Sequence, residues 1–135
     1  MADDVAAQEF AVLLVVDRLN EAFLVAERGG LAADELTEDE SAQIADTLKR
    51  DHKSVAVDLK SEDLDLFYYG FCNRTIWPLF HYFLEYSEFE LSNWEIYEAV
   101  NRKFAEAVLE QACEDDILWV HDYQLMLVPQ MVREK

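Results

Sequence analysis

Residues 68–82 read YYGFCNRTIWPLFHY and alternate large rings with polar side chains. Phe71 and Trp77 are suited to a core, and Pro78 predicts a helix boundary or kink because it lacks a backbone N–H and restricts the residue before it. Two interpretations of the stretch stay open. It is a buried helix with a few satisfied polar groups, or it is a sugar site in which rings stack on C–H surfaces and polar tips meet hydroxyls.

Charge narrows the possible partners of the chain. The 135 residues carry 29 acidic and 11 basic side chains, a formal net charge of -18. Nucleic acid and anionic membrane surfaces would repel such a chain, so neither is expected as a partner. The acidic excess also suits a salty cytoplasm or simple solubility. A phosphorylated substrate would have to be bound by local donors such as arginines and helix N-termini.

The sequence predicts a cytoplasmic location and no metal site. The first residues, MADDVAAQEF, lack the features of a signal peptide, and no apolar run is long enough to span a bilayer, so a cytoplasmic location is expected. Cys72 and Cys113 show no metal-ligand spacing and are predicted to be free thiols. No metal site is predicted.

Three apolar runs predict strands, at residues 10–16, 54–59 and 117–120. Thr37 with Glu40, and Ser92 with Glu95, predict capping boxes at two helix starts. The stripe of Trp94, Tyr97, Asn101, Phe104 and Val108 has helical spacing and is predicted to be core. The alternation of strands and helices predicts an α/β fold, a partial doubly wound, Rossmann-like parallel sheet with helices on both faces. Residues 1–9 are expected to be frayed, and residues 10–135 to form one domain.

Three ordered motifs carry a family resemblance. They are YYGFCNRTIWPLFHY, WE.Y..VN..FA at residues 94–105, and WVHDYQLMLVPQMVRE from residue 119. Together with VVDRL at 15–19 and GGL at 29–31, they resemble the trehalose-6-phosphate synthases of glycosyltransferase family 20. The resemblance implies an incomplete N-terminal lobe of the two-lobed GT-B fold, and it is faint between residues 32 and 55.

The family's chemistry suggests roles for single residues. The resemblance implies transfer of glucose from UDP-glucose to glucose 6-phosphate with retention of configuration, without a metal or other cofactor. Arg18, Tyr68 and Trp77 match residues that bind glucose 6-phosphate, and Gly30 matches a glycine near the nucleotide diphosphate. Asp122 matches the catalytic carboxylate beside the reacting sugar. His81 and His121 are possible ligand contacts, although a satisfied core histidine or a loop-orienting one is as good an explanation.

Two departures from the family pattern qualify this expectation. Asp17 stands where an uncharged polar residue is usual before the arginine, and Gln124 follows HDY, as in bacterial members. The family's second lobe carries the arginine and lysine that neutralise the departing diphosphate, and nothing in residues 1–135 replaces them. The chain is therefore expected to be inactive alone, and to self-associate or to pair with a separate C-terminal lobe. The alternatives are a glucosylglycerol-phosphate synthase and a non-catalytic sugar-phosphate-binding module.

Overall fold

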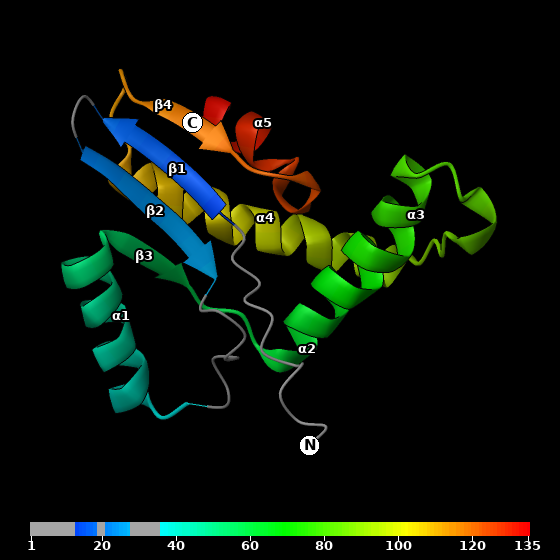
Figure 1. Ribbon diagram of the computed structural model, residues 1–135, viewed down its shortest axis with the longest axis horizontal. Helices are drawn as coiled ribbons and strands as arrows, with labels where there is room; N and C mark the ends of the chain where they lie inside the picture. The colour runs from blue at the N-terminus through cyan, green and yellow to red at the C-terminus, as the bar shows by residue number, and fades with distance from the viewer. Residues whose placement is uncertain (1–12, 19–20, 28–35) are drawn as a thin grey trace.

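The computed structural model describes residues 13–18, 21–27 and 36–135, and their side chains from residue 36 onward, except that of His52. A sheet of four strands forms one end of the molecule, and the helical segment of residues 61–91 forms the other (Figure 1). The long helix α4, Leu91–Gln111, runs behind the sheet and reaches both ends. Residues 1–9, expected to be frayed, lie outside the described residues.

The sheet is mixed. Its strands are β1 (Leu13–Arg18), β2 (Glu21–Glu27), β3 (Ser54–Val57) and β4 (Ile117–Val120), in the spatial order β3-β2-β1-β4. Strand β1 pairs antiparallel with both β2 and β4, while β2 and β3 pair in parallel. Strands β2, β3 and β4 therefore share one direction, and β1 runs against them.

The expectation of three parallel neighbouring strands is wrong, because β1 runs antiparallel to β4, and β3 and β4 lie at opposite edges of the sheet. Arg18 pairs with Glu21, so only two residues separate β1 from β2, and such a connection can join only antiparallel strands, because a parallel pair needs a long crossover. The helical crossover from β3 to β4 does keep those two strands in one direction. Strand β2 was missed in the sequence, although its apolar run AFLVA is typical of a strand.

The helices are grouped around the sheet unevenly. Helix α1 (Glu38–His52) lies beside the edge strand β3, α5 (Val128–Arg133) lies beside β4, and α4 lies behind (Figure 1). In this view no described helix crosses the near face of β1 and β2, so the expected cover on both faces is not found in the part of the chain that the structure describes. Within that same part, no helix is both long and apolar enough to cross a membrane.

One of the two predicted capping boxes is present. At the start of α1, the Thr37 hydroxyl accepts from the Glu40 backbone N–H, and the Glu40 carboxylate accepts from the Thr37 backbone N–H, which lowers the Glu40 pKa. The second box is wrong. Helix α4 begins two residues earlier than expected, at Leu91, and its N-cap Glu90 makes no side-chain capping bond.

The core lies between α4 and the aromatic stretch. Tyr97, Phe104 and Val108 of α4 are fully buried, as the helical stripe predicts, although Trp94 at its start is 39% exposed. The same core continues into the segments before and after α4 through Phe67, Cys72, Ile76, Leu125 and Val128. The segment that follows the aromatic stretch stays exposed, with Tyr82, Phe83, Leu84, Tyr86, Phe89 and Leu91 all at the surface.

Candidate functional site

The aromatic stretch is wound more widely than an ordinary α-helix. Helix α2 (Ser61–Leu64) leads into η2 (Asp65–Ile76), a π-helix, and the Trp77 N–H that ends it donates to the Cys72 carbonyl five residues earlier. Long π segments are rare and are frequent at functional sites. The winding changes at α3 (Trp77–Phe80), next to Pro78, which confirms the predicted boundary. Tyr68, Asn73 and Trp77 all come from this segment.

Asp122 stands in a strained backbone conformation directly after β4. Its φ is 62° and its ψ is 178°, a region that is populated almost entirely by glycine. Such strain costs on the order of 1–3 kcal/mol and persists only where the surroundings impose it. Its carboxylate accepts a hydrogen bond from the Tyr123 N–H at 2.8 Å, which begins the short helix η4 (Tyr123–Leu125). The strained conformation of Asp122 therefore lowers the stability of the folded chain while it fixes the position of this carboxylate.

Two buried polar residues of α4 hold the loop that follows Asp122. The Tyr97 hydroxyl donates to the Tyr123 carbonyl at 2.8 Å and accepts from the Met126 N–H at 3.2 Å. The Asn101 amide donates to the Gln124 carbonyl at 3.0 Å and accepts from the Leu127 N–H at 3.1 Å. Both side chains are fully buried. Because buried polar groups need hydrogen-bond partners, this network fixes the loop of residues 122–127 on α4.

Tyr123 joins this loop to the aromatic stretch. Its hydroxyl donates to the Asn73 side-chain oxygen at 3.4 Å, and its ring centroid lies 5.5 Å from that of Trp77. The Asn73 amide is also hydrogen-bonded to the Tyr68 hydroxyl. Rings and amide dipoles from η2 and α3 therefore meet the loop that carries Asp122.

The charge at this junction is concentrated on Asp122. Burial raises the pKa of Tyr68, and burial raises the pKa of both Tyr123 and Cys72 to about 12, with the Asp122 carboxylate adding to each shift. Near neutral pH the two phenols remain protonated, so they can donate hydrogen bonds, while an ionised carboxylate accepts them. Such a set can bind the hydroxyls of a sugar.

Tyr68, Trp77 and Asp122, three of the predicted site residues, are brought together here. Gly30 lies outside the described residues. Arg18 ends β1, but its side chain is also outside them, so its predicted phosphate contact stays a prediction.

The two histidines are engaged within their own segments. His81 contacts the Trp77 carbonyl through Nδ1 at 2.7 Å, and its ring centroid lies 4.0 Å from that of Trp77. His121 stacks on Trp119, with a centroid distance of 5.0 Å and parallel planes. His81 therefore lies at the rim of the site, while the ring of His121 is directed toward Trp119 of β4.

Four residues of the site were missed in the sequence: Asn73, Tyr97, Asn101 and Tyr123. A signal was present for Asn101, because an asparagine within a buried apolar stripe needs hydrogen-bond partners. The described residues also contain no group of three or more histidine, cysteine, aspartate or glutamate side chains that could hold a metal ion. The expected absence of a cofactor stays a prediction.

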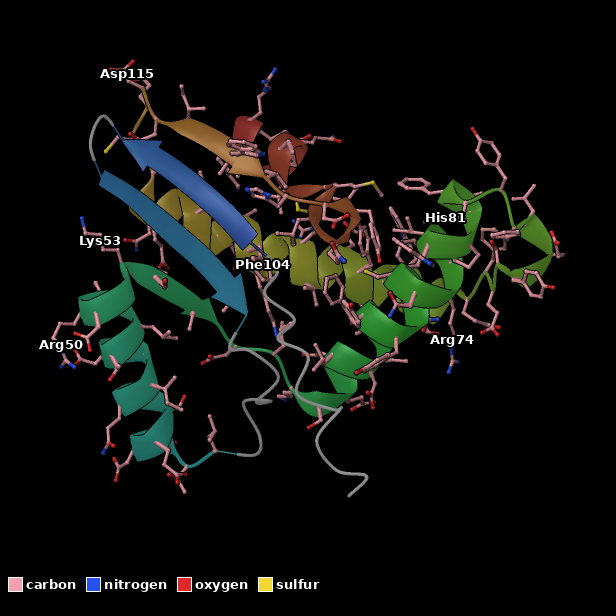
Figure 2. All side chains as sticks on the ribbon, viewed as in Figure 1. Arg50, Lys53, Arg74, His81, Phe104 and Asp115 are labelled. Atoms are coloured by element: carbon pink, nitrogen blue, oxygen red, sulfur yellow. The ribbon has the colours of Figure 1, made fainter. Side chains whose placement is uncertain are left out.

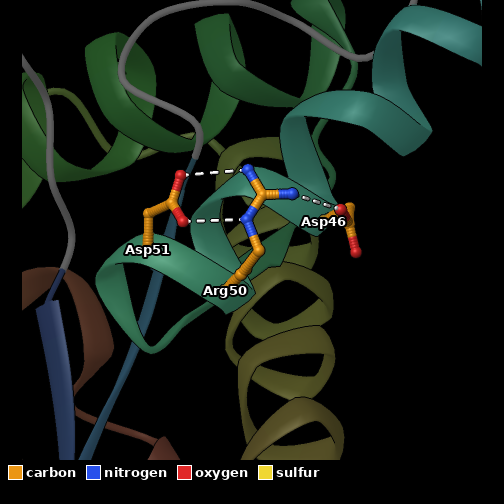
Figure 3. Close-up of polar contacts among 3 residues, drawn as sticks. All are labelled: Asp46, Arg50 and Asp51. Atoms are coloured by element: carbon orange, nitrogen blue, oxygen red, sulfur yellow. Dashed lines mark hydrogen bonds and ion pairs between the residues drawn. The ribbon is translucent and has the colours of Figure 1, made fainter.

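Four of the nine lysine and arginine side chains that the structure describes form ion pairs with acidic neighbours. Arg50, at the end of α1, contacts Asp46 at 3.1 Å and Asp51 at 2.8 Å (Figure 3). Further ion pairs join Arg74 to Glu88, Arg102 to Glu98 and Lys103 to Asp63. Arg50 and Arg74 also lie at opposite ends of the molecule (Figure 2). Exposed pairs of this kind add little stability.

The two cysteines are expected to react very differently. Cys72 is fully buried with a raised pKa, whereas Cys113 is exposed. Near pH 8, a disulfide reagent such as DTNB should label one thiol per native chain and both in denaturant, since the thiolate is the reactive form. The Cys113→Ser variant should lose the rapid phase. Equal reaction of both thiols in the native chain would contradict this site geometry.

The pKa of Cys72 also has a consequence for stability. The folded chain holds the thiol proton more tightly than the unfolded chain, for which the ordinary value is 9.0. The free energy of unfolding should therefore fall as pH rises from that value toward about 12. Cys72→Ala should flatten this part of the profile measured by urea denaturation.

Comparison with known proteins defines the class. The chain matches the family model described as Glycosyltransferase family 20 over residues 4–135, and it therefore belongs to that family. It is 43% identical over 101 residues to the UDP-forming α,α-trehalose-phosphate synthase of Emericella nidulans, covering 75% of this chain and 20% of that protein. It is 51% identical over 78 residues to the bifunctional trehalose-6-phosphate synthase/phosphatase of Thermoproteus tenax, covering 58% of this chain and 11% of that one.

Solved structures agree. A UDP-forming α,α-trehalose-phosphate synthase from Burkholderia xenovorans matches with a TM-score of 0.57 and 38% identity, over 60% of this chain and 18% of that one. A structure from the same organism contains glucose-6-phosphate, and the Escherichia coli protein has been solved with UDP-2-fluoro glucose. The chain spans about a fifth of the length of the relatives it matches.

Proposed function

We propose that this chain is part of the N-terminal GT-B lobe of a trehalose-phosphate synthase, a retaining glycosyltransferase that moves glucose from UDP-glucose to glucose 6-phosphate. The proposal rests on one observation above all. The loop that carries Asp122 is held on α4, and Tyr123 joins it to Asn73 and Trp77 of the aromatic stretch. The names of the relatives supply the substrate class, and a cytoplasmic location belongs to the same proposal.

In this proposal the aromatic stretch forms the acceptor side of the site. Trp77 is 49% exposed, so its ring can stack on a sugar, while Tyr68 and Asn73 offer polar tips. Arg18 would contact the phosphate as a charge-assisted fork, and Gly30 would lie by the diphosphate of the donor. Asp122 would accept hydrogen bonds from hydroxyls of the reacting glucose. These roles are carried over from the family motifs.

The exposed apolar segment after α3 supports the proposed need for a partner. Tyr82 is 92% exposed and Leu91 is 71% exposed, with further rings between them. Apolar patches of this kind mark surfaces that other protein covers. A separate C-terminal lobe or a second copy of the chain fits this requirement.

A chimeric enzyme tests the function. The Burkholderia xenovorans synthase would receive residues 61–135 of this chain in place of its aligned segment. Release of UDP that requires both UDP-glucose and glucose 6-phosphate is expected, with kcat within about tenfold of the parent enzyme, a change of roughly 1.4 kcal/mol in the barrier. The 135-residue chain alone should release none. A folded chimera without turnover would contradict the proposal.

A further inference from the structure

A second cleft lies on another side of the aromatic stretch. It has a volume of about 530 Å³ and is formed by η2 and the start of α4, with Asp65, Tyr69, Gly70, Asn73, Arg74 and Asn93 among its lining residues. This is the size of a small-molecule site. Tyr68, Trp77 and Asp122 do not line it. Asn73 does, and so it stands between this cleft and the site described above.

Asn93 gives this cleft an unusual polar wall. The residue is only 7% exposed, yet its side-chain amide has no hydrogen-bond partner among the residues that the structure describes. It is also held close to η2, since a Cβ placed on Gly70 would lie 3.0 Å from its amide atoms. Its amide atoms face the open cleft, since the fully enclosed side-chain polar atom without a partner among the described residues is the Ser87 hydroxyl. A ligand in the cleft would therefore meet both a donor and an acceptor on Asn93.

The surrounding groups select a neutral, hydroxyl-rich ligand. Asp65 offers a carboxylate that accepts hydrogen bonds and repels anions, and the amide of Asn93 both donates and accepts. Tyr69 is 45% exposed and offers a ring face. The charge of Arg74 is balanced by Glu88 at 3.7 Å, whose backbone N–H also donates to the Arg74 carbonyl at 2.8 Å. A phosphate would meet Asp65 and would compete with Glu88 for Arg74.

From these contacts we infer that the cleft between η2 and α4 is an accessory site for a neutral saccharide or polyol. Hydroxyls of the ligand pair with the Asn93 amide and the Asp65 carboxylate, and one ring face of the ligand packs on Tyr69. Asn73 borders both sites, and its amide is hydrogen-bonded to Tyr68 and Tyr123. A ligand bound in the cleft is therefore expected to alter these two hydrogen bonds.

Titration of the full chain with methyl α-D-glucoside, up to about 100 mM, tests this site. Side-chain amide resonances of Asn93 should shift saturably in ¹H–¹⁵N spectra. Asn93→Ala and the surface variant Asp65→Ala should each weaken binding at least about fivefold, as expected for a lost hydrogen bond. Asp65 is exposed, so this second variant should fold even if the first does not. Asp115→Ala is the matched control and should change nothing.

Three results would overturn the inference. The first is the absence of a saturable shift at Asn93. The second is unchanged binding in a folded Asn93→Ala or Asp65→Ala variant. The third is loss of the shift in Trp77→Ala, which would put the sugar in the site beside Asp122. The proposed transferase function does not depend on any of these outcomes.

Discussion

Replacing Asp122 by asparagine in the chimeric enzyme is expected to lower kcat at least about 100-fold, the loss typical when a preorganised electrostatic contact is removed from an active site. Asparagine keeps the shape of aspartate, and the hydrogen bonds from Tyr97 and Asn101 that hold the loop are unchanged, so the φ of 62° should survive. What changes is the charge that accepts hydrogen bonds from the reacting sugar. Steady-state release of UDP measures the effect.

The same substitution elsewhere gives the control. Asp115→Asn changes an exposed aspartate before β4 (Figure 2), and it should leave kcat within about twofold of the chimera, because surface changes away from such features are usually small. The unfolding midpoints of both variants should stay close to that of the unmodified chimera. Full activity of Asp122→Asn would remove Asp122 from the proposed catalytic role.

Asn101→Ala is expected to lower the free energy of unfolding by about 2–4 kcal/mol, because it leaves buried backbone groups unpaired and opens a cavity. The Gln124 carbonyl and the Leu127 N–H would both lose their partner. Urea denaturation of the 135-residue chain, followed by far-UV circular dichroism, measures the loss. The loop of residues 122–127 should also become more open to hydrogen exchange.

Glu98→Ala is the matched control on the same helix. It removes an exposed ion pair with Arg102 at 2.9 Å, and such pairs are worth about 0.3–0.5 kcal/mol. The loss in the free energy of unfolding for Tyr97→Phe should lie between those of Asn101→Ala and Glu98→Ala, since only a hydroxyl is removed. If Asn101→Ala cost no more than Glu98→Ala, α4 would not be what holds the loop.

The local patterns of the sequence predicted much of this fold. The start of β3 at Ser54, the bounds of β4 and the capping box at Thr37 follow from apolar runs and from capping chemistry, which depend on neighbouring residues alone. The α4 stripe predicted the core because helical periodicity reports burial directly. The direction of β1 could not be read in this way. It depends on the pairing of β1 with β2, a strand that was not predicted.

The site was predicted only in its outline. Tyr68, Trp77 and Asp122 came from family motifs, and they are joined through Tyr123 and Asn73. No local rule predicts that Tyr97 and Asn101, spaced as core residues, turn their polar groups to a loop more than twenty residues away. The π-winding of η2 and the positive φ of Asp122 are likewise imposed by tertiary contacts, which a propensity argument does not include.

The central claim is that the aromatic stretch and the loop after β4 form one sugar-phosphate site. Titration of the 135-residue chain with glucose 6-phosphate, followed at the indole N–H of Trp77, tests it most directly. We expect a saturable shift with a dissociation constant on the order of millimolar, because the site is open on the side of Trp77, whose side chain is 49% exposed.

Two comparisons make this titration specific. The indole of Trp119 is 65% exposed on β4 and should not shift. When both variants are followed at the side-chain amide of Asn73, Arg18→Ala should weaken binding more than Trp77→Ala does, because a charge-assisted bond is about twice as strong as a neutral one. The account predicts a Trp77 shift with glucose 6-phosphate that is much larger than with glucose. Equal shifts with the two sugars, or unchanged binding in Arg18→Ala, would contradict it and leave the aromatic stretch as core alone.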